Sequence, residues 1–112
     1  GGHVRVNSHS TTGPIALKTI SHFAKYKLIL GVDSFSFENG ISTPNMEEAM
    51  LNQAMIAQAS QVIAVFDSSK FNKRSFCHIA TADQIDAIVT DNNLPVGYLS
   101  RLKEKNIALY LA

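Results

Sequence analysis

Cysteine and tryptophan are nearly absent from this chain of 112 residues, which contains one cysteine, Cys77, and no tryptophan. A single thiol can form neither an internal disulfide nor a cysteine metal cluster, so the fold must depend on its apolar core. Chains without disulfides are typical of a reducing compartment. We therefore expect a cytoplasmic protein with no metal site and no cofactor.

Long apolar runs and an excess of charge are also missing. No apolar run approaches the length of a membrane span, and the amino terminus lacks the basic and apolar blocks of a signal peptide. Ten basic and nine acidic residues leave a net charge of +1. The densest basic group is Lys70 with Lys73 and Arg74, and the last two are predicted to lie in a solvated loop. We expect neither membrane binding nor direct nucleic acid binding by this segment.

The composition, with 46% hydrophobic and 17% charged residues, is normal for one globular domain or part of one. The chain opens on Gly1-Gly2 without an initiating methionine and runs straight into a strand pattern. We therefore expect that the start of a larger protein is missing.

The most informative stretch is an uninterrupted apolar run at residues 62–66, VIAVF, which is followed by DSSK. Its β-branched residues and short length predict a strand buried on both faces, as in the centre of a parallel sheet. Asp67, Ser68, Ser69 and Lys70 would then emerge at the carboxyl end of the strand, where ligands bind in open α/β sheets. A lysine beside two hydroxyls suits a phosphate or a polyol, but Asp-Ser-Ser is also ordinary turn chemistry.

A second buried strand, at residues 27–32, ends at Asp33. It is followed by a predicted polar loop, SFSFENG, which closes on Gly40 and whose two phenylalanines we expect to pack in the core or an interface. Asp33 would lie on the same rim as Lys70. There it could accept hydrogen bonds from sugar hydroxyls, or it could merely cap the loop.

Helical spacing predicts a first helix over residues 14–24, with Thr12 as its N-cap. The turn STTG before it is also a weak candidate for a phosphate-cradling loop. A second helix is predicted to open at Pro44, with Glu47 and Glu48 in its first turn at the positive end of the helix dipole.

A third helix, over residues 94–105, is predicted to turn Val96, Leu99 and Leu102 inward. Short apolar segments predict further strands at residues 3–6, 76–80, 87–90 and 107–111. Strands and helices that alternate in this way indicate an α/β fold with a mainly parallel sheet flanked by helices.

The order and spacing of these segments resemble the carboxyl-terminal sensor domain of the DeoR family of bacterial transcriptional regulators. The resemblance covers essentially all of the chain. The matching positions are Gly1-Gly2, Gly13-Pro14 with Ala16, Asp33, Gly40, Asp67-Ser68-Ser69-Lys70, Ile85-Asp86 and Val89-Thr90-Asp91.

The resemblance implies a fold shared with ribose-5-phosphate isomerases and CoA transferases. It also implies a homo-oligomeric repressor of carbohydrate metabolism genes that senses a phosphorylated sugar or related metabolite and contacts operator DNA through an amino-terminal winged helix-turn-helix. Residues 1–112 would be a partial effector-sensing domain that lacks the helix-turn-helix and the first part of the sensor. The implied ligand-binding residues are Asp33, Gly40, Asp67, Ser68, Ser69 and Lys70.

Two rival hypotheses come from other classes. One is a sugar-phosphate isomerase or its inactive relic, because the related isomerases share the Asp-x-Ser-Lys turn. Their general base is a glutamate on the preceding helix, however, and the matching position here is Asn52, whose amide cannot abstract a proton. We therefore expect no catalytic residue. The other rival is a purely structural oligomerisation segment. Separately, we expect a second copy of the chain to cover the apolar edge of the presumed sheet.

Overall fold

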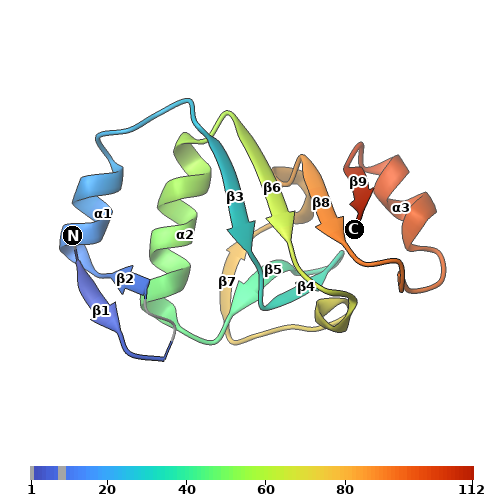
Figure 1. Cartoon of the computed structure of the whole chain (residues 1–112), viewed down its shortest axis with the longest axis horizontal. Helices are drawn as coiled ribbons and strands as arrows, with labels where there is room; N and C mark the ends of the chain where they lie inside the picture. Colours follow the sequence, from blue (N-terminus) through green and yellow to red (C-terminus); the bar gives the residue numbers. More distant parts are fainter. Residues whose placement is uncertain (1, 8–9) are drawn as a thin grey trace.

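The structure, a computed structural model, describes residues 2–7 and 10–112. Its centre is a four-stranded sheet in the order β3-β6-β8-β9, and all three neighbouring pairs are parallel. Helices α1 and α2 lie on the side of the edge strand β3, and α3 lies beside the other edge strand, β9 (Figure 1). The predicted α/β class with a parallel sheet is confirmed. The four strands are β3 (Lys27–Gly31), β6 (Gln61–Val65), β8 (Ala87–Thr90) and β9 (Ala108–Leu111).

An antiparallel sheet of three strands, in the order β4-β5-β7, forms a second layer. The segment predicted as a loop at residues 34–40 is instead the start of a hairpin, so that prediction is wrong. The reason is the alternation Ser-Phe-Ser, which turns Phe35 toward Ile41 and into the core, where both are fully buried. The strands are β4 (Ser34–Ser36), β5 (Gly40–Thr43) and β7 (Cys77–Ala80).

The amino-terminal segment forms a small antiparallel pair of strands, β1 (His3–Arg5) and β2 (Ser10–Thr12). Thr12 is therefore a strand residue and not the predicted helix cap. Helix α1 (Pro14–Ile20) is capped by Gly13 without a side-chain hydrogen bond, and it ends four residues before the predicted Ala24.

Helix α2 (Met46–Gln58) begins two residues after the predicted Pro44, because Asn45 is its N-cap and its side chain accepts a hydrogen bond of 2.9 Å from the amide of Glu48. Glu47 and Glu48 lie in the first turn, as predicted. Short 3-10 helices, η1 (Ser68–Lys70) and η2 (Ala82–Gln84), follow β6 and β7.

Helix α3 (Tyr98–Glu104) starts later than predicted, after Gly97 in a left-handed conformation with φ 83°. Leu102 faces the core, as predicted, and is 1% exposed. The prediction is wrong for Val96, which precedes the helix, and for Leu99, which is 52% exposed. Tyr98 is buried instead, four residues before Leu102 and so on the same face of the helix.

An aromatic cluster fills the core between the two sheets and α3. The ring centroids of Phe35 and Phe66 are 5.7 Å apart in a stacked arrangement, and those of Phe37 and Tyr98 are 4.7 Å apart edge to face. Phe71 packs edge to face on Phe35, Phe66 and Tyr98. The predicted packing role of the two hairpin phenylalanines is confirmed, and the cluster lies directly beneath the turn that follows β6.

The parallel sheet has one buried and one open face. On β6, Val62 and Ala64 are buried, whereas Ile63 is half-buried and Val65 is 38% exposed. Its neighbour Ile29 on β3 is 70% exposed. The prediction of a strand buried on both faces is therefore wrong, because Val65 stays exposed on the second face.

Candidate ligand-binding rim

Three aspartates lie in one row at the carboxyl edge of the parallel sheet. Gly31 pairs with Val65, and Val65 pairs with Val89. Asp33, Asp67 and Asp91 each follow one of these paired residues by two positions. Because the strands are parallel and in register, all three carboxylates come to the same rim.

Asp67 organises the turn that carries Ser68, Ser69 and Lys70. Its Oδ1 accepts hydrogen bonds from the hydroxyl of Ser69 and, at 2.9 Å, from the backbone amide of Ser69. These two bonds, with a smaller contribution from the Lys70 ammonium, hold the pKa of the Asp67 carboxyl below its ordinary value. The turn is thus a 3-10 helix with a side-chain cap and a fixed anion at its start.

Asp91 fixes the same turn from the neighbouring strand. Its Oδ2 accepts a 2.8 Å hydrogen bond from the backbone amide of Ser68, and its Oδ1 accepts one of 3.0 Å from Asn93. These backbone hydrogen bonds lower the pKa of the Asp91 carboxyl. The sequence shows that β8 ends in an acid, but only the sheet order, which places β8 beside β6, reveals this positioning role.

Lys70 is half-buried at the end of η1. Its backbone amide donates to the carbonyl of Asp67 at 3.1 Å. Across residues 2–7 and 10–112, the Lys70 ammonium makes no hydrogen bond and no salt bridge. The rim therefore offers one cation that is available to pair with an anionic group.

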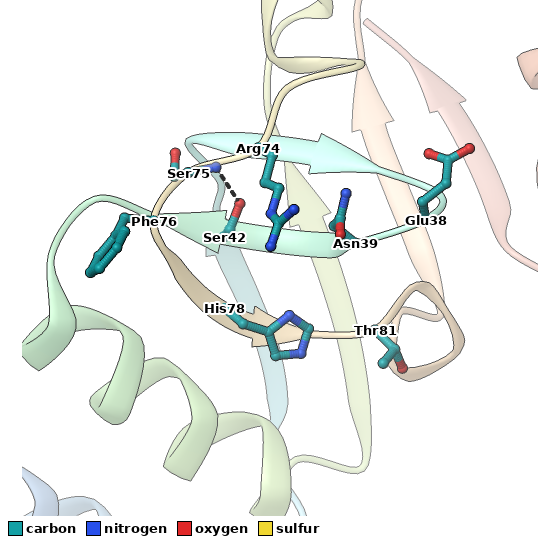
Figure 2. A pocket seen from close by; sticks show the side chains of 8 residues that line it. All are labelled: Glu38, Asn39, Ser42, Arg74, Ser75, Phe76, His78 and Thr81. Carbon is teal, nitrogen blue, oxygen red and sulfur yellow. Dashed lines mark hydrogen bonds between the residues drawn. The ribbon is translucent and has the colours of Figure 1, made fainter.

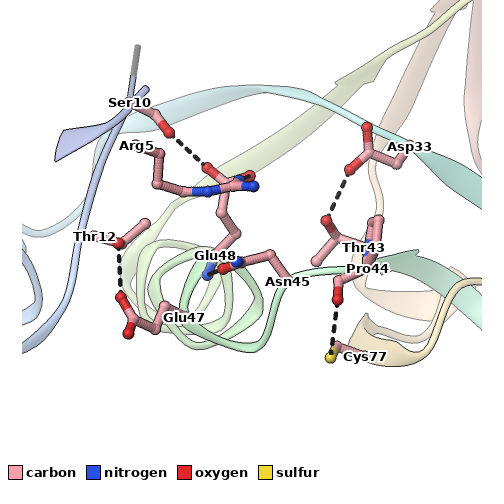
Figure 3. A network of polar contacts seen from close by, with 10 residues as sticks. All are labelled: Arg5, Ser10, Thr12, Asp33, Thr43, Pro44, Asn45, Glu47, Glu48 and Cys77. Atoms are coloured by element: carbon pink, nitrogen blue, oxygen red, sulfur yellow. Dashed lines mark hydrogen bonds and ion pairs between the residues drawn. The ribbon is translucent and has the colours of Figure 1, made fainter. Parts of the chain in front are cut away.

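Asp33 is exposed on the rim, and its Oδ2 accepts a 2.7 Å hydrogen bond from the hydroxyl of Thr43. Figure 3 shows this pair beside the amino-terminal end of α2. The bond orients the carboxylate and leaves Oδ1 without a bond to another described residue. Asp33, Ser68, Ser69 and Lys70 are thus brought to the same edge, as expected from the sequence.

Gly40 lies at the opposite end of the β4–β5 hairpin from Asp33, because Ser36 pairs with Gly40 while Ser34 pairs with Ser42. Its φ is 69°, and a Cβ at this position would lie 1.9 Å from the backbone oxygen of Ala80. Close packing of β5 on β7 therefore explains a glycine here.

A polar network not foreseen from the sequence joins the amino-terminal strands to the first turn of α2 (Figure 3). Arg5 forms a 3.1 Å ion pair with Glu48, which also accepts a 2.9 Å hydrogen bond from the hydroxyl of Ser10. The buried hydroxyl of Thr12 donates to Glu47 at 2.9 Å. Both glutamates are thus engaged by partners more than 30 residues away in the chain.

Among the residues that the structure describes, no three His, Cys, Asp or Glu side chains are grouped so that they could hold a metal ion. Within that same part of the chain, none of the helices has the length and apolar character needed to cross a membrane.

Comparisons with known proteins agree on one class. The chain is 38% identical over 93 residues to the transcriptional repressor AccR of Agrobacterium fabrum, covering 82% of this chain and 36% of that protein. It is 34% identical over 109 residues to the HTH-type transcriptional regulator GlpR of Haloferax volcanii (97% and 43%), and 33% identical over 106 residues to the HTH-type transcriptional repressor GlcR of Bacillus subtilis (95% and 40%). The chain thus spans about two fifths of the length of such relatives.

The chain is thus an α/β domain that is similar, over nearly its whole length, to part of several transcription regulators. The model of the DeoR C-terminal sensor domain matches residues 1–92. The chain therefore belongs to the DeoR C-terminal sensor domain family.

Proposed function

We propose that this chain binds a phosphorylated sugar, or a related metabolite, at the rim and serves as the effector-sensing part of a cytoplasmic repressor of carbohydrate metabolism genes. The observation that carries the proposal is the half-buried Lys70 ammonium, which has no salt bridge among the described residues and lies on one sheet edge with Asp33. A lysine of this kind can pair with a phosphate as a compact point charge.

The remaining rim residues supply complementary roles. The free oxygen of Asp33 accepts hydrogen bonds from sugar hydroxyls. The Ser69 hydroxyl already donates its one proton to Asp67, so its oxygen accepts from the ligand, and the Ser68 hydroxyl adds a further hydrogen bond. Asp67 and Asp91 keep the turn in place and contact the ligand less directly. A phosphate is expected to lie at Lys70, because the three carboxylates of the rim would repel an anion placed elsewhere on it.

Regulation in this proposal is a population shift. An effector that binds one arrangement of subunits better than another moves the homo-oligomer toward or away from the DNA-competent state. Operator DNA is contacted through a helix-turn-helix in another part of the protein. The relatives support this proposal because their names describe transcriptional regulators and repressors.

The proposal excludes enzymatic turnover as the main function. Asn52 occupies the position at which the related isomerases have the glutamate that acts as general base. Glu47 and Glu48 are held by hydrogen bonds and an ion pair. No free carboxylate on α2 is thus placed to abstract a proton.

A thermal-shift screen of the intact protein tests the proposal. Phosphorylated sugars are compared with the same sugars lacking phosphate, in the parent protein and in the Lys70→Ala and Lys73→Ala variants. Ligand at a hundred times its dissociation constant stabilises the folded state by about 2.7 kcal/mol, which raises the melting temperature by several degrees. Lys73 is an exposed cation near Lys70 and so controls for general charge effects.

We expect at least one phosphosugar to stabilise the parent and Lys73→Ala, and to lose that effect in Lys70→Ala. A panel in which no phosphosugar shifts the parent, or in which both variants respond like the parent, would contradict the proposed site. The change in operator DNA affinity caused by the same phosphosugar, whether a loss or a gain, then reports its regulatory effect.

A further inference from the structure

A second polar site lies on the outer face of the antiparallel sheet, away from the rim. The chain that connects η1 to β7 folds across this face. The amide of Lys73 donates to the carbonyl of Phe35 at 3.1 Å, and the amide of Ser75 donates to the hydroxyl oxygen of Ser42 at 2.8 Å. The hydroxyls of Ser75 and Ser34 share a 2.6 Å hydrogen bond. The connection is therefore fastened to the sheet.

A cavity of about 170 Å³ lies between this connection and the sheet. Figure 2 shows the Arg74 side chain extending from the connection over β5, with its guanidinium between Ser42 and Asn39 and directed toward His78. Since one water occupies about 30 Å³ of liquid, the cavity has room for roughly five or six waters' volume, which suits one small ion or functional group.

The lining of the cavity is rich in hydrogen-bond donors. Ser42 uses its oxygen to accept from Ser75, so its proton is available to a ligand. The side-chain amide of Asn39 donates one N–H to Ser36 at 3.3 Å and has a second N–H. Neither the Arg74 guanidinium nor the His78 ring forms a hydrogen bond or salt bridge within the described part of the chain.

One carboxylate, that of Glu38, also borders the cavity. It forms a 3.4 Å ion pair with Arg101, and in Figure 2 it points away from Arg74. Arg101 in turn lies 4.2 Å from the centre of the Phe37 ring. Arg101 therefore offsets the charge of the Glu38 carboxylate, which lies away from Arg74. The Arg74 guanidinium leaves the part of the cavity near His78 with a positive charge.

We propose that this cavity is a binding site for a small oxyanion, a phosphate or carboxylate group, held by Arg74, His78, Ser42 and Asn39. It is separate from the rim because neighbouring residues of a strand point to opposite faces: Ser42 lines the cavity, whereas Thr43 bonds to Asp33 on the rim. A planar guanidinium with five donors suits either oxyanion. The inference does not depend on the sugar-phosphate proposal.

Amide chemical shifts followed by NMR, during titration with inorganic phosphate and separately with acetate, test the site. Titration of Lys70→Ala removes the cation of the rim, so the remaining shifts report other sites. The variants Arg74→Ala and Lys73→Ala are compared in that background. Both residues are exposed cations on the same connection, but only Arg74 lines the cavity.

We expect phosphate or acetate to shift the amides of Ser42, Ser75 and His78, and Arg74→Ala to weaken that binding about tenfold or more, as loss of a charge-assisted hydrogen bond does. Lys73→Ala should leave the affinity within about twofold, since Lys73 does not line the cavity and its exposed charge is screened by solvent. Absence of shifts at these amides with both anions, or equal weakening by the two variants, would overturn the proposal. The anion that binds more tightly identifies the group that the site prefers.

Discussion

Two buried threonines differ in whether their hydroxyl forms a hydrogen bond. The hydroxyl of Thr12 is fully buried and donates to Glu47, whereas that of Thr90, 4% exposed at the end of β8, has no hydrogen-bond partner among the described residues. Replacing each by valine keeps the shape and removes the hydroxyl. A lost hydrogen bond costs about 1 kcal/mol, while a buried hydroxyl without a partner contributes nothing favourable.

We therefore expect Thr12→Val to lower the free energy of unfolding by about 1–2 kcal/mol, and Thr90→Val to leave it unchanged or raise it. Urea denaturation of the two variants and the parent measures both changes. A larger loss for Thr90→Val than for Thr12→Val would show that the Thr90 hydroxyl has a role in the folded protein that its surroundings do not explain.

Gly40 and Gly31 form a second matched pair of residues. A Cβ at Gly40 would meet the Ala80 backbone oxygen at 1.9 Å and would sit at a positive φ, whereas no heavy atom lies within 4 Å of the Cβ position at Gly31. We expect Gly40→Ala to lower the free energy of unfolding by about 3 kcal/mol or more, and Gly31→Ala to change it by less than about 1 kcal/mol. Thermal unfolding of both variants checks this, and similar melting temperatures would contradict it.

The placement of two candidate site residues at the carboxyl edge of the sheet could be predicted from the sequence, whereas their role in binding stays a prediction. Asp33 comes two residues after the end of β3, and Lys70 lies in the short turn that follows β6, so the ends of those strands give their location. Arg74 could not be predicted in this way. It lines a cavity only because the Ser75 hydrogen bonds hold its segment over a sheet formed by distant parts of the chain.

The η1 turn is the element on which the rim depends, and its stability should depend on pH. The pKa values of Asp67 and Asp91 are lowered by hydrogen bonds that exist only in the folded state. A lowered folded-state pKa gives stabilisation that is fully present above the unfolded value of about 3.9 and is lost as the pH falls through the folded values.

We therefore expect the amides of Ser68 and Ser69 to keep their neutral-pH NMR shifts down to about pH 4 and to change only below it. Titration midpoints of these amides at or above the ordinary aspartate pKa would contradict the assignment. Asp91→Ala removes the acceptor for the Ser68 amide and should broaden or move that signal at neutral pH.

Elements whose signal is local were predicted with ends accurate to one or two residues. The strands β3, β6 and β8 are examples, because apolar runs bounded by polar residues define them. The β4–β5 hairpin was missed because its serine faces are buried under the connection to β7, so its strands look like a polar loop in the sequence. The starts of α2 and α3 were misplaced because Asn45 and Gly97, rather than the prolines, set their first turns.

Among residues 2–7 and 10–112, an apolar face of the parallel sheet is exposed. It includes Ile29, Val65 and Tyr110, with exposures of 70%, 38% and 61%. Apolar patches of this kind mark interaction surfaces. We expect this face to contact a second copy of the protein in the proposed homo-oligomer.

Sedimentation velocity over a range of concentrations tests this assignment. We expect the parent to associate and Ile29→Lys to shift the distribution toward monomer, because burying an unpaired ammonium in an apolar contact is costly. Val96→Lys is the control, since Val96 is fully exposed but lies outside the sheet. A sharp monomer for the parent at high concentration, or equal effects of the two variants, would count against it.

The most direct test of the central claim compares the dissociation constants of two ligands for three proteins, measured by isothermal titration calorimetry. The best phosphosugar from the screen and the same sugar without phosphate are titrated into the intact protein and into Lys70→Met, with Lys73→Met as the control. If Lys70 pairs with the phosphate, the parent and the control prefer the phosphorylated sugar by about tenfold or more, and Lys70→Met loses that preference. An equal preference in all three proteins would show that the phosphate binds elsewhere and would contradict the assignment of this rim as the effector site.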